Sequence, residues 1–141
     1  MSDPFDLERF VAAQDDGRTY DRALAELEAG RKTSHWMWFV LPQIAGLGSS
    51  PMAQRYAIRS LEEARAYLAH PVLGPRLVTA AQVIAAGPAP DAETLLGPID
   101  GQKLRSSMTL FARAAPDEPA FAAVLDRYFE SEADPATDER L

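Results

Sequence analysis

Helix-starting and helix-stopping residues divide the whole chain into short segments, and they constrain the fold more than any other feature. The 141 residues include 11 prolines and 8 glycines, and the apolar residues between them follow the spacing of a helix. One segment places apolar residues at i, i+3, i+4 and i+7, namely Tyr20, Ala23, Leu24 and Leu27. Gly30 then ends this segment. The pattern predicts a mostly α-helical fold, a compact single domain of many short helices with at most a minor two-stranded piece.

Residues that cap helices mark where several of these segments begin. The capping candidates are Asp3, Ser50, Ser60 and Asp91. Helices are expected at about residues 4–14, 51–58, 92–96 and 102–114, and around the apolar residues of 20–27, 61–68, 73–84 and 121–129. Residues 1–130 should form the helical domain. Residues 131–141 should form an acidic C-terminal tail.

The composition excludes several classes of function. The formal net charge of −7 at pH 7 argues against sequence-independent binding to nucleic acid, which needs a basic surface. The absence of cysteine excludes thiol catalysis, disulfides and thiolate zinc sites. Because His35 and His70 lie in different elements, we expect no metal site, and no cofactor is predicted.

No apolar run reaches the length of about 20 residues that spans a bilayer, and the acidic N-terminus is unlike a signal peptide. We therefore expect a cytoplasmic protein without a membrane partner.

The segment 31–43 concentrates the kinds of side chain that line a ligand pocket: aromatic rings, cations and an imidazole. It holds both tryptophans of the chain. The binding candidates are Arg31, Lys32, Trp36, Trp38 and Gln43, with His35 as a titratable group. If Ser34 caps a helix here, Trp36 and Trp38 face different sides of it. Each ring could instead fill the core, and His35 could be a structural histidine.

A turn rich in glycine and serine follows directly. Gly46-Leu47-Gly48-Ser49-Ser50 precedes Pro51 and a short helix. Unhindered backbone amides, hydroxyls and a helix N-terminus can hold an anion, which makes Gly48 and Ser50 binding candidates. The same residues could simply form a capped loop.

A third polar segment, 100–109, carries Asp100, Lys103, Ser106 and Ser107. Helical spacing aligns Lys103 with the serines on one face. Serine is a weak choice inside a helix, so close packing or ligand contact is expected at Ser106 and Ser107. Asp100 could be a catalytic carboxylate or only a helix cap. We expect residues 31–50 and 100–107 to meet around one cleft.

Motifs in a fixed order along nearly the whole chain carry a family resemblance. They include Ala23-Leu24-x-Glu26-Leu27, Gly30-x-Lys32-x-Ser34-His35-Trp36-Met37-Trp38-Phe39 and Lys103-Leu104-x-Ser106-Ser107-Met108-Thr109-Leu110-Phe111. In this order they resemble an uncharacterised family labelled only as a domain of unknown function and sometimes mislabelled calpastatin. The resemblance implies a helical fold and brings no assigned activity.

A fainter similarity rests on Ser50-Pro51-Met52-Ala53, His70-Pro71-x-Leu73 and Leu96-Gly97 through Asp100. These segments are similar in order to the NADAR superfamily, which is associated with NAD and ADP-ribose. It includes N-glycosidases that act on riboflavin-pathway intermediates and on ADP-ribosylated guanine. The acidic motif of that superfamily is missing here, because Ser34-His35 has no Glu beside it. This departure weakens the case for hydrolysis more than the case for binding.

Together these features predict one pocket for an anionic small molecule, a phosphorylated ribosyl or nucleotide-like compound. If the protein is an enzyme, the expected reaction is hydrolysis of an N-glycosidic bond. Asp100 or Glu26 would then be the carboxylate, and His35 or Lys32 the proton donor. The alternative is a non-catalytic protein-interaction module that uses an exposed aromatic patch. A pocket would bury the tryptophans partly around a concavity, whereas a module would display them on a flat surface.

Overall fold

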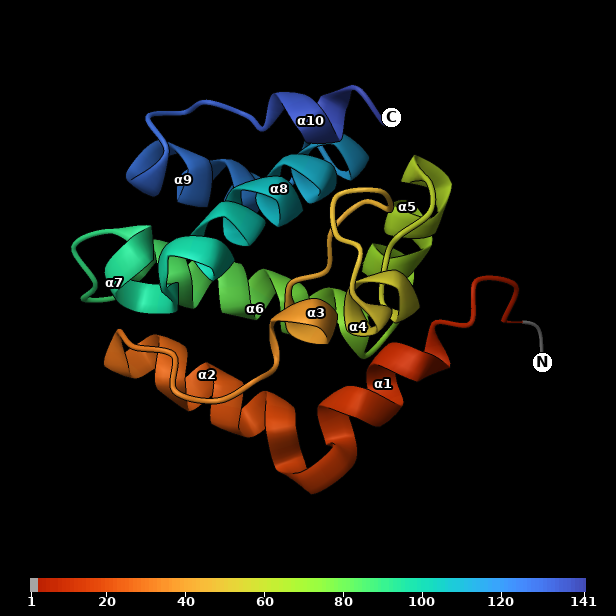
Figure 1. Ribbon diagram of the computed structural model, residues 1–141, viewed down its shortest axis with the longest axis horizontal. Helices are drawn as coiled ribbons and strands as arrows, with labels where there is room; N and C mark the ends of the chain where they lie inside the picture. The colour runs from red at the N-terminus through yellow and green to blue at the C-terminus, as the bar shows by residue number, and fades with distance from the viewer. Residues whose placement is uncertain (1–2) are drawn as a thin grey trace.

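The computed structural model describes residues 3–141 and folds them into the helices labelled α1 to α10 in Figure 1. In chain order these are α1 (Glu8–Asp15), a 3-10 turn η1 (Asp16–Arg18), α2 (Thr19–Ala29), α3 (Met37–Val40), α4 (Pro51–Arg55), α5 (Leu61–Ala69), α6 (Leu73–Ala86), α7 (Ala92–Leu96), α8 (Pro98–Ala114), α9 (Pro119–Tyr128) and α10 (Pro135–Asp138). Within residues 3–141 the β pairing consists of one parallel bridge between Ile44 and Ile58. The prediction of a mostly α-helical single domain is confirmed.

Three of the expected caps begin helices as predicted. The side-chain oxygens of Ser50, Ser60 and Asp91 each accept a hydrogen bond from the backbone N–H three residues later, at 3.1, 3.0 and 2.6 Å. Asp3 also caps, accepting from the N–H groups of Leu7 and Glu8. These bonds satisfy donors that the first turn of a helix leaves free.

Some boundaries differ from the expected ones for local reasons. The first helix begins at Glu8 rather than near residue 4, because the backbone turns through a positive φ of 51° at Asp6. The helix α4 stops at Arg55, because Ile58 N–H is drawn into a hydrogen bond with the carbonyl of Gln43. The helix α8 begins four residues early, at Pro98, a residue whose fixed φ suits the first helical position.

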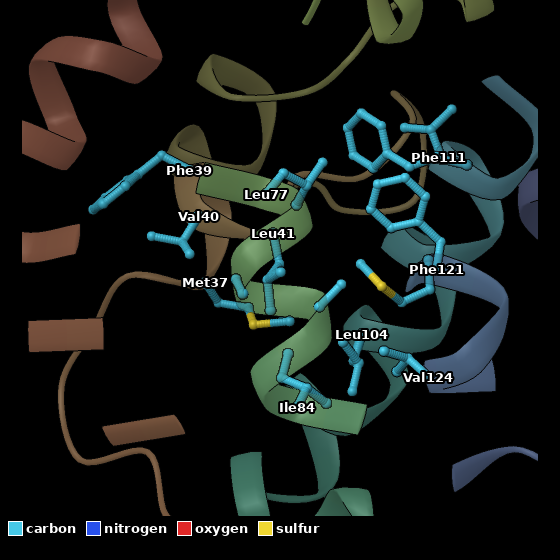
Figure 2. Packing of buried hydrophobic residues seen from close by; sticks show 14 of the residues in the cluster. Met37, Phe39, Val40, Leu41, Leu77, Ile84, Leu104, Phe111, Phe121 and Val124 are labelled. Carbon is cyan, nitrogen blue, oxygen red and sulfur yellow. The ribbon is translucent and has the colours of Figure 1, made fainter. Parts of the chain in front are cut away.

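The hydrophobic core lies between the middle helices. In Figure 1, α6 and α8 run through the middle, with α2 on one side and α9 and α10 on the other. Figure 2 shows side chains of α3, α6, α8 and α9 packed into one cluster. The labelled members are Met37, Phe39, Val40, Leu41, Leu77, Ile84, Leu104, Phe111, Phe121 and Val124. The aromatic segment thus contributes to this core through α3, which also packs against α1.

Residues 131–141, expected as an acidic tail, pack along α8 as part of the folded unit. Thr137 is completely buried, and Arg105 donates hydrogen bonds to two backbone carbonyls of this segment. Arg113 forms a paired contact with Asp138, its Nε lying 2.9 Å from Oδ1. The arginines of α8 therefore complement the acidic segment, which is why it docks there.

In residues 3–141 no helix combines the length and the apolar character needed to cross a membrane.

Candidate functional site

Both lysines of the chain meet on one carboxylate. The Nζ of Lys32 lies 3.1 Å from Oδ2 of Asp100, and the Nζ of Lys103 lies 3.4 Å from Oδ1. Each ammonium also lies over a tryptophan ring, Lys32 at 5.4 Å from the centre of Trp36 and Lys103 at 5.5 Å from that of Trp38. The two polar segments therefore meet in space, as the sequence predicted.

Local structure explains how this lysine cluster (Lys32, Asp100 and Lys103) assembles. Gly97 adopts a φ of 92° and lets the chain turn into α8. This puts Asp100 in the first helical turn, where the helix dipole favours a carboxylate. Lys32 is held from the other side, because its backbone N–H donates to the carbonyl of Leu95 at 2.7 Å.

The cluster has one more positive charge than negative, and its members differ in exposure. The side chain of Lys32 is 10% exposed and that of Asp100 is 19% exposed, whereas that of Lys103 is 25% exposed. Lys32 is thus committed to holding Asp100. Lys103 is the member best placed to reach a molecule in solution.

A groove of about 490 Å³, the Lys103 groove, runs between α8 and the loop before α4. This volume falls within the range of about 300–1,000 Å³ that is typical of small-molecule sites. The side that α8 contributes consists of Ile99, Gln102, Lys103 and Ser106. The loop and α4 contribute Gln43, Leu47, Gly48, Ser49, Ser50 and Ala53, and the C-terminal segment contributes Asp134 and Ala136. Predicted residues from both segments therefore line one groove.

A smaller cavity of about 190 Å³, the Trp38 hollow, shares a wall with this groove. Trp38 is half-buried and lines the hollow together with Tyr56. Gln43, Gly48 and Ala53 line both cavities. At Gly48 a Cβ atom would lie 2.7 Å from that of Ala53, so only glycine lets the loop approach α4 this closely. The hydroxyl of Ser50 accepts the hydrogen bond that caps α4. For Ser50, this is the structure that the alternative interpretation, a capped loop, predicted.

Glu26, at the end of α2, anchors the aromatic segment from inside the protein. Its Oε1 accepts hydrogen bonds from the backbone N–H groups of Thr33 and Ser34 and from Nε1 of Trp36, at 2.7, 3.0 and 3.0 Å. The hydroxyl of Ser34 donates to Oε2. Burial alone would raise the pKa of Glu26, but these hydrogen bonds outweigh it and lower the pKa to about 2. Glu26 is 8% exposed and lines neither cavity, so its carboxylate can position the loop but reach no ligand there.

Other residues singled out in the sequence lie elsewhere. Trp36 is completely buried and has no surface for a ligand. His35 is exposed and lines a different groove, formed with α1 and α4, and Arg31 is exposed. Ser106 donates to Oδ2 of Asp134 at 2.8 Å, whereas Ser107 is completely buried and its hydroxyl has no hydrogen-bond partner in the part of the chain that the structure describes.

Comparison with known proteins identifies the family. A family model described as "Protein of unknown function (DUF1810)" matches residues 4–141. The chain belongs to this family. The structure is similar to the crystal structure of the conserved hypothetical protein Rv1873 from Mycobacterium tuberculosis, with 51% sequence identity, a TM-score of 0.95, and coverage of 99% of this chain and 98% of that chain. No curated protein matches the sequence. The predicted membership of an uncharacterised family is confirmed, and the similarity to NADAR stays a prediction.

Sequence reasoning missed two kinds of groove residue in this DUF1810 protein. Ile99 and Gln102 share the helix face of Lys103, and the i, i+4 spacing of Ile99 and Lys103 could have revealed it. Asp134 gave no signal, because its place depends on how the C-terminal segment docks. Within residues 3–141, no group of three or more acidic or histidine side chains could hold a metal ion. The arrangement offers one available ammonium, side-chain amides and backbone groups, a set suited to holding an anion.

Proposed function

We propose that the protein binds a small organic phosphate, a phosphorylated ribosyl or nucleotide-like molecule, in the Lys103 groove. The observation that carries the proposal is the position of Lys103, the most exposed member of a cluster with excess positive charge, on the groove wall. Hydrogen bonds between an ammonium and phosphate oxygens are charge-assisted and therefore strong. The side-chain amides of Gln43 and Gln102 line the same groove and can donate to further ligand oxygens.

The charge distribution favours a phosphate on the Lys103 side of the groove. Among the described residues that line it, Asp134 is the acidic one, and it would repel an anion placed beside it. Its carboxylate already accepts hydrogen bonds from Ser106 and Thr137. A ligand phosphate is therefore favoured next to Lys103 and away from Asp134.

The geometry supports binding ahead of N-glycosidic hydrolysis. Hydrolysis needs a carboxylate that can activate water or stabilise an oxocarbenium-like state. Both oxygens of Asp100 face ammonium groups, Glu26 is enclosed by its hydrogen bonds, and His35 lines a different groove. We therefore propose a binding protein, with hydrolysis as the activity to examine if a bound nucleotide is consumed.

The alternative, a protein-interaction module, has less support. It depends on an exposed aromatic patch, yet Trp36 is completely buried and Trp38 is half-buried in a hollow. In residues 3–141 the large apolar side chains that are exposed are Ile99 and Leu141. Neither is aromatic.

Calorimetric titration with AMP and with ribose 5-phosphate tests the proposal. Lys103→Ala should weaken binding about ten- to a hundredfold, because it removes a charge-assisted contact worth about 1.5–3 kcal/mol. Arg65→Ala is the matched control, since Arg65 is an exposed cation on α5 that lines neither the groove nor the hollow. Melting temperatures establish that both variants fold. No binding of either compound by the wild-type protein, or equal affinity in folded Lys103→Ala, would contradict the proposal.

A further inference from the structure

Ile99 is an exposed apolar side chain on the wall of the Lys103 groove. Its exposure is 72%, and Leu141, at 42%, is the other exposed large apolar residue of the described chain. Leu141 does not line the groove. A single exposed isoleucine means little by itself, but this one lies beside a cation on the wall of a groove.

The position of Ile99 relative to Lys103 places its exposed side chain next to the cation of the groove. Both belong to α8, four residues apart, so their side chains project from the same face of the helix. Leu47, partly buried against the core, lines the same groove from the opposing loop. The groove therefore offers the apolar side chain of Ile99 one helical turn from a cation, and that of Leu47 on the opposing loop.

This pairing discriminates between classes of organic phosphate. A sugar phosphate carries hydroxyl groups around its ring, and covering Ile99 with them would remove those hydroxyls from water without a partner. The flat face of a nucleobase is apolar, so packing it on Ile99 removes apolar surface of both from water. The polar edge of such a base could meet the side-chain amide of Gln102, which lines the groove one turn before Ser106.

We propose that Ile99 is the base-contacting residue of the site, so that the ligand is a nucleoside phosphate rather than a bare sugar phosphate. This inference rests on the proposed function. The phosphate is held at Lys103, and the base covers Ile99 and Leu47. Affinity for the base-bearing ligand then contains a contribution from Ile99 that affinity for the sugar phosphate lacks.

The test compares AMP with ribose 5-phosphate, which share the phosphate and the ribose and differ in the base. Ile99→Ala should weaken AMP binding about tenfold, the loss expected when apolar contact with one side chain is removed. The same variant should leave ribose 5-phosphate binding unchanged. Leu141→Ala, the matched control, should change neither affinity. Ile99→Leu keeps the apolar volume and should bind AMP within about twofold of the wild-type protein.

The outcomes separate this inference from the proposed function. If the wild-type protein binds neither compound, the proposed function fails, and this inference fails with it. If the wild-type protein binds AMP with Lys103-dependent affinity but Ile99→Ala binds it equally well, only this inference is overturned. An equal loss for AMP and ribose 5-phosphate would overturn it too, because the effect would not involve the base.

Discussion

Replacing Glu26 with glutamine tests whether a buried negative charge holds the aromatic segment in place. The amide of Glu26→Gln keeps the shape of the side chain. Its oxygen can still accept from Thr33, Ser34 and Trp36, and its NH2 group can donate to the hydroxyl of Ser34. The substitution therefore removes the charge and little else.

The size of the effect follows from the pKa of Glu26. Burial raises this pKa, but the hydrogen bonds to Glu26 lower it from the ordinary value of 4.5 to about 2. At about 1.4 kcal/mol per pH unit, the ionised carboxylate contributes about 3 kcal/mol to the free energy of unfolding at pH 7. Because the pKa is lower in the folded protein, this contribution is fully present above pH 4.5 and is lost as the pH falls toward 2. At pH 3, about 1 kcal/mol of it remains.

Urea unfolding followed by tryptophan fluorescence measures these quantities at pH 7 and pH 3. We expect Glu26→Gln to lower the free energy of unfolding by about 3 kcal/mol at pH 7 and by about 1 kcal/mol at pH 3. Glu28→Gln is the matched control, because Glu28 lies exposed on the same helix. It should change stability by less than about 0.5 kcal/mol at either pH.

Two results would refute this reasoning. A loss below about 1 kcal/mol at pH 7 would mean that the hydrogen-bonded carboxylate is not a major source of stability. An equal loss at both pH values would mean that the substitution acts through packing rather than through charge. In either case the loop that carries Lys32 and Trp36 would need another anchor.

Two further predictions concern α8. Ser107→Ala removes a buried hydroxyl without a partner and should raise the free energy of unfolding by up to about 1 kcal/mol; a clearly lower melting temperature would show that the hydroxyl has a partner in solution. Deleting residues 132–141 removes the buried Thr137 and the hydrogen bonds of Asp134 to α8, and should lower the free energy of unfolding by about 2–3 kcal/mol. Unchanged urea unfolding would contradict docking of this segment.

Much of the helical framework was predictable because it depends on neighbours in sequence. The caps at Ser50, Ser60 and Asp91 bond the N–H three residues later, and Gly30 ends α2 in the left-handed conformation expected of it. The spacing of apolar residues predicted α6 and α9 for the same reason. The predicted end of a helix was wrong where a residue distant in sequence took the backbone hydrogen bonds. Ile58, expected at the end of α4, instead pairs its backbone with residues 43–45.

The candidate site was predictable in composition but not in geometry. Sequence reasoning singled out Lys32, Asp100 and Lys103, yet it could not pair Lys32 with Asp100. It placed Trp36 and Trp38 on different faces of a helix but made both of them binding candidates, although one is buried and the other lines a hollow. Ser34 bonds Glu26 instead of capping a helix, α3 begins only at Met37, and Nε1 of Trp36 also donates to Glu26 in the interior.

The sequence by itself determined where helices start and stop, the excess of acidic residues, and the family to which the chain belongs. Only the tertiary structure decided that Glu26 is enclosed, that Ile99 is exposed beside Lys103, and that the acidic C-terminus forms a groove wall. Capping and periodicity act over about four residues and can be read along a chain. Burial and ion pairing depend on which distant segments meet when the core packs, and that depends on the whole fold.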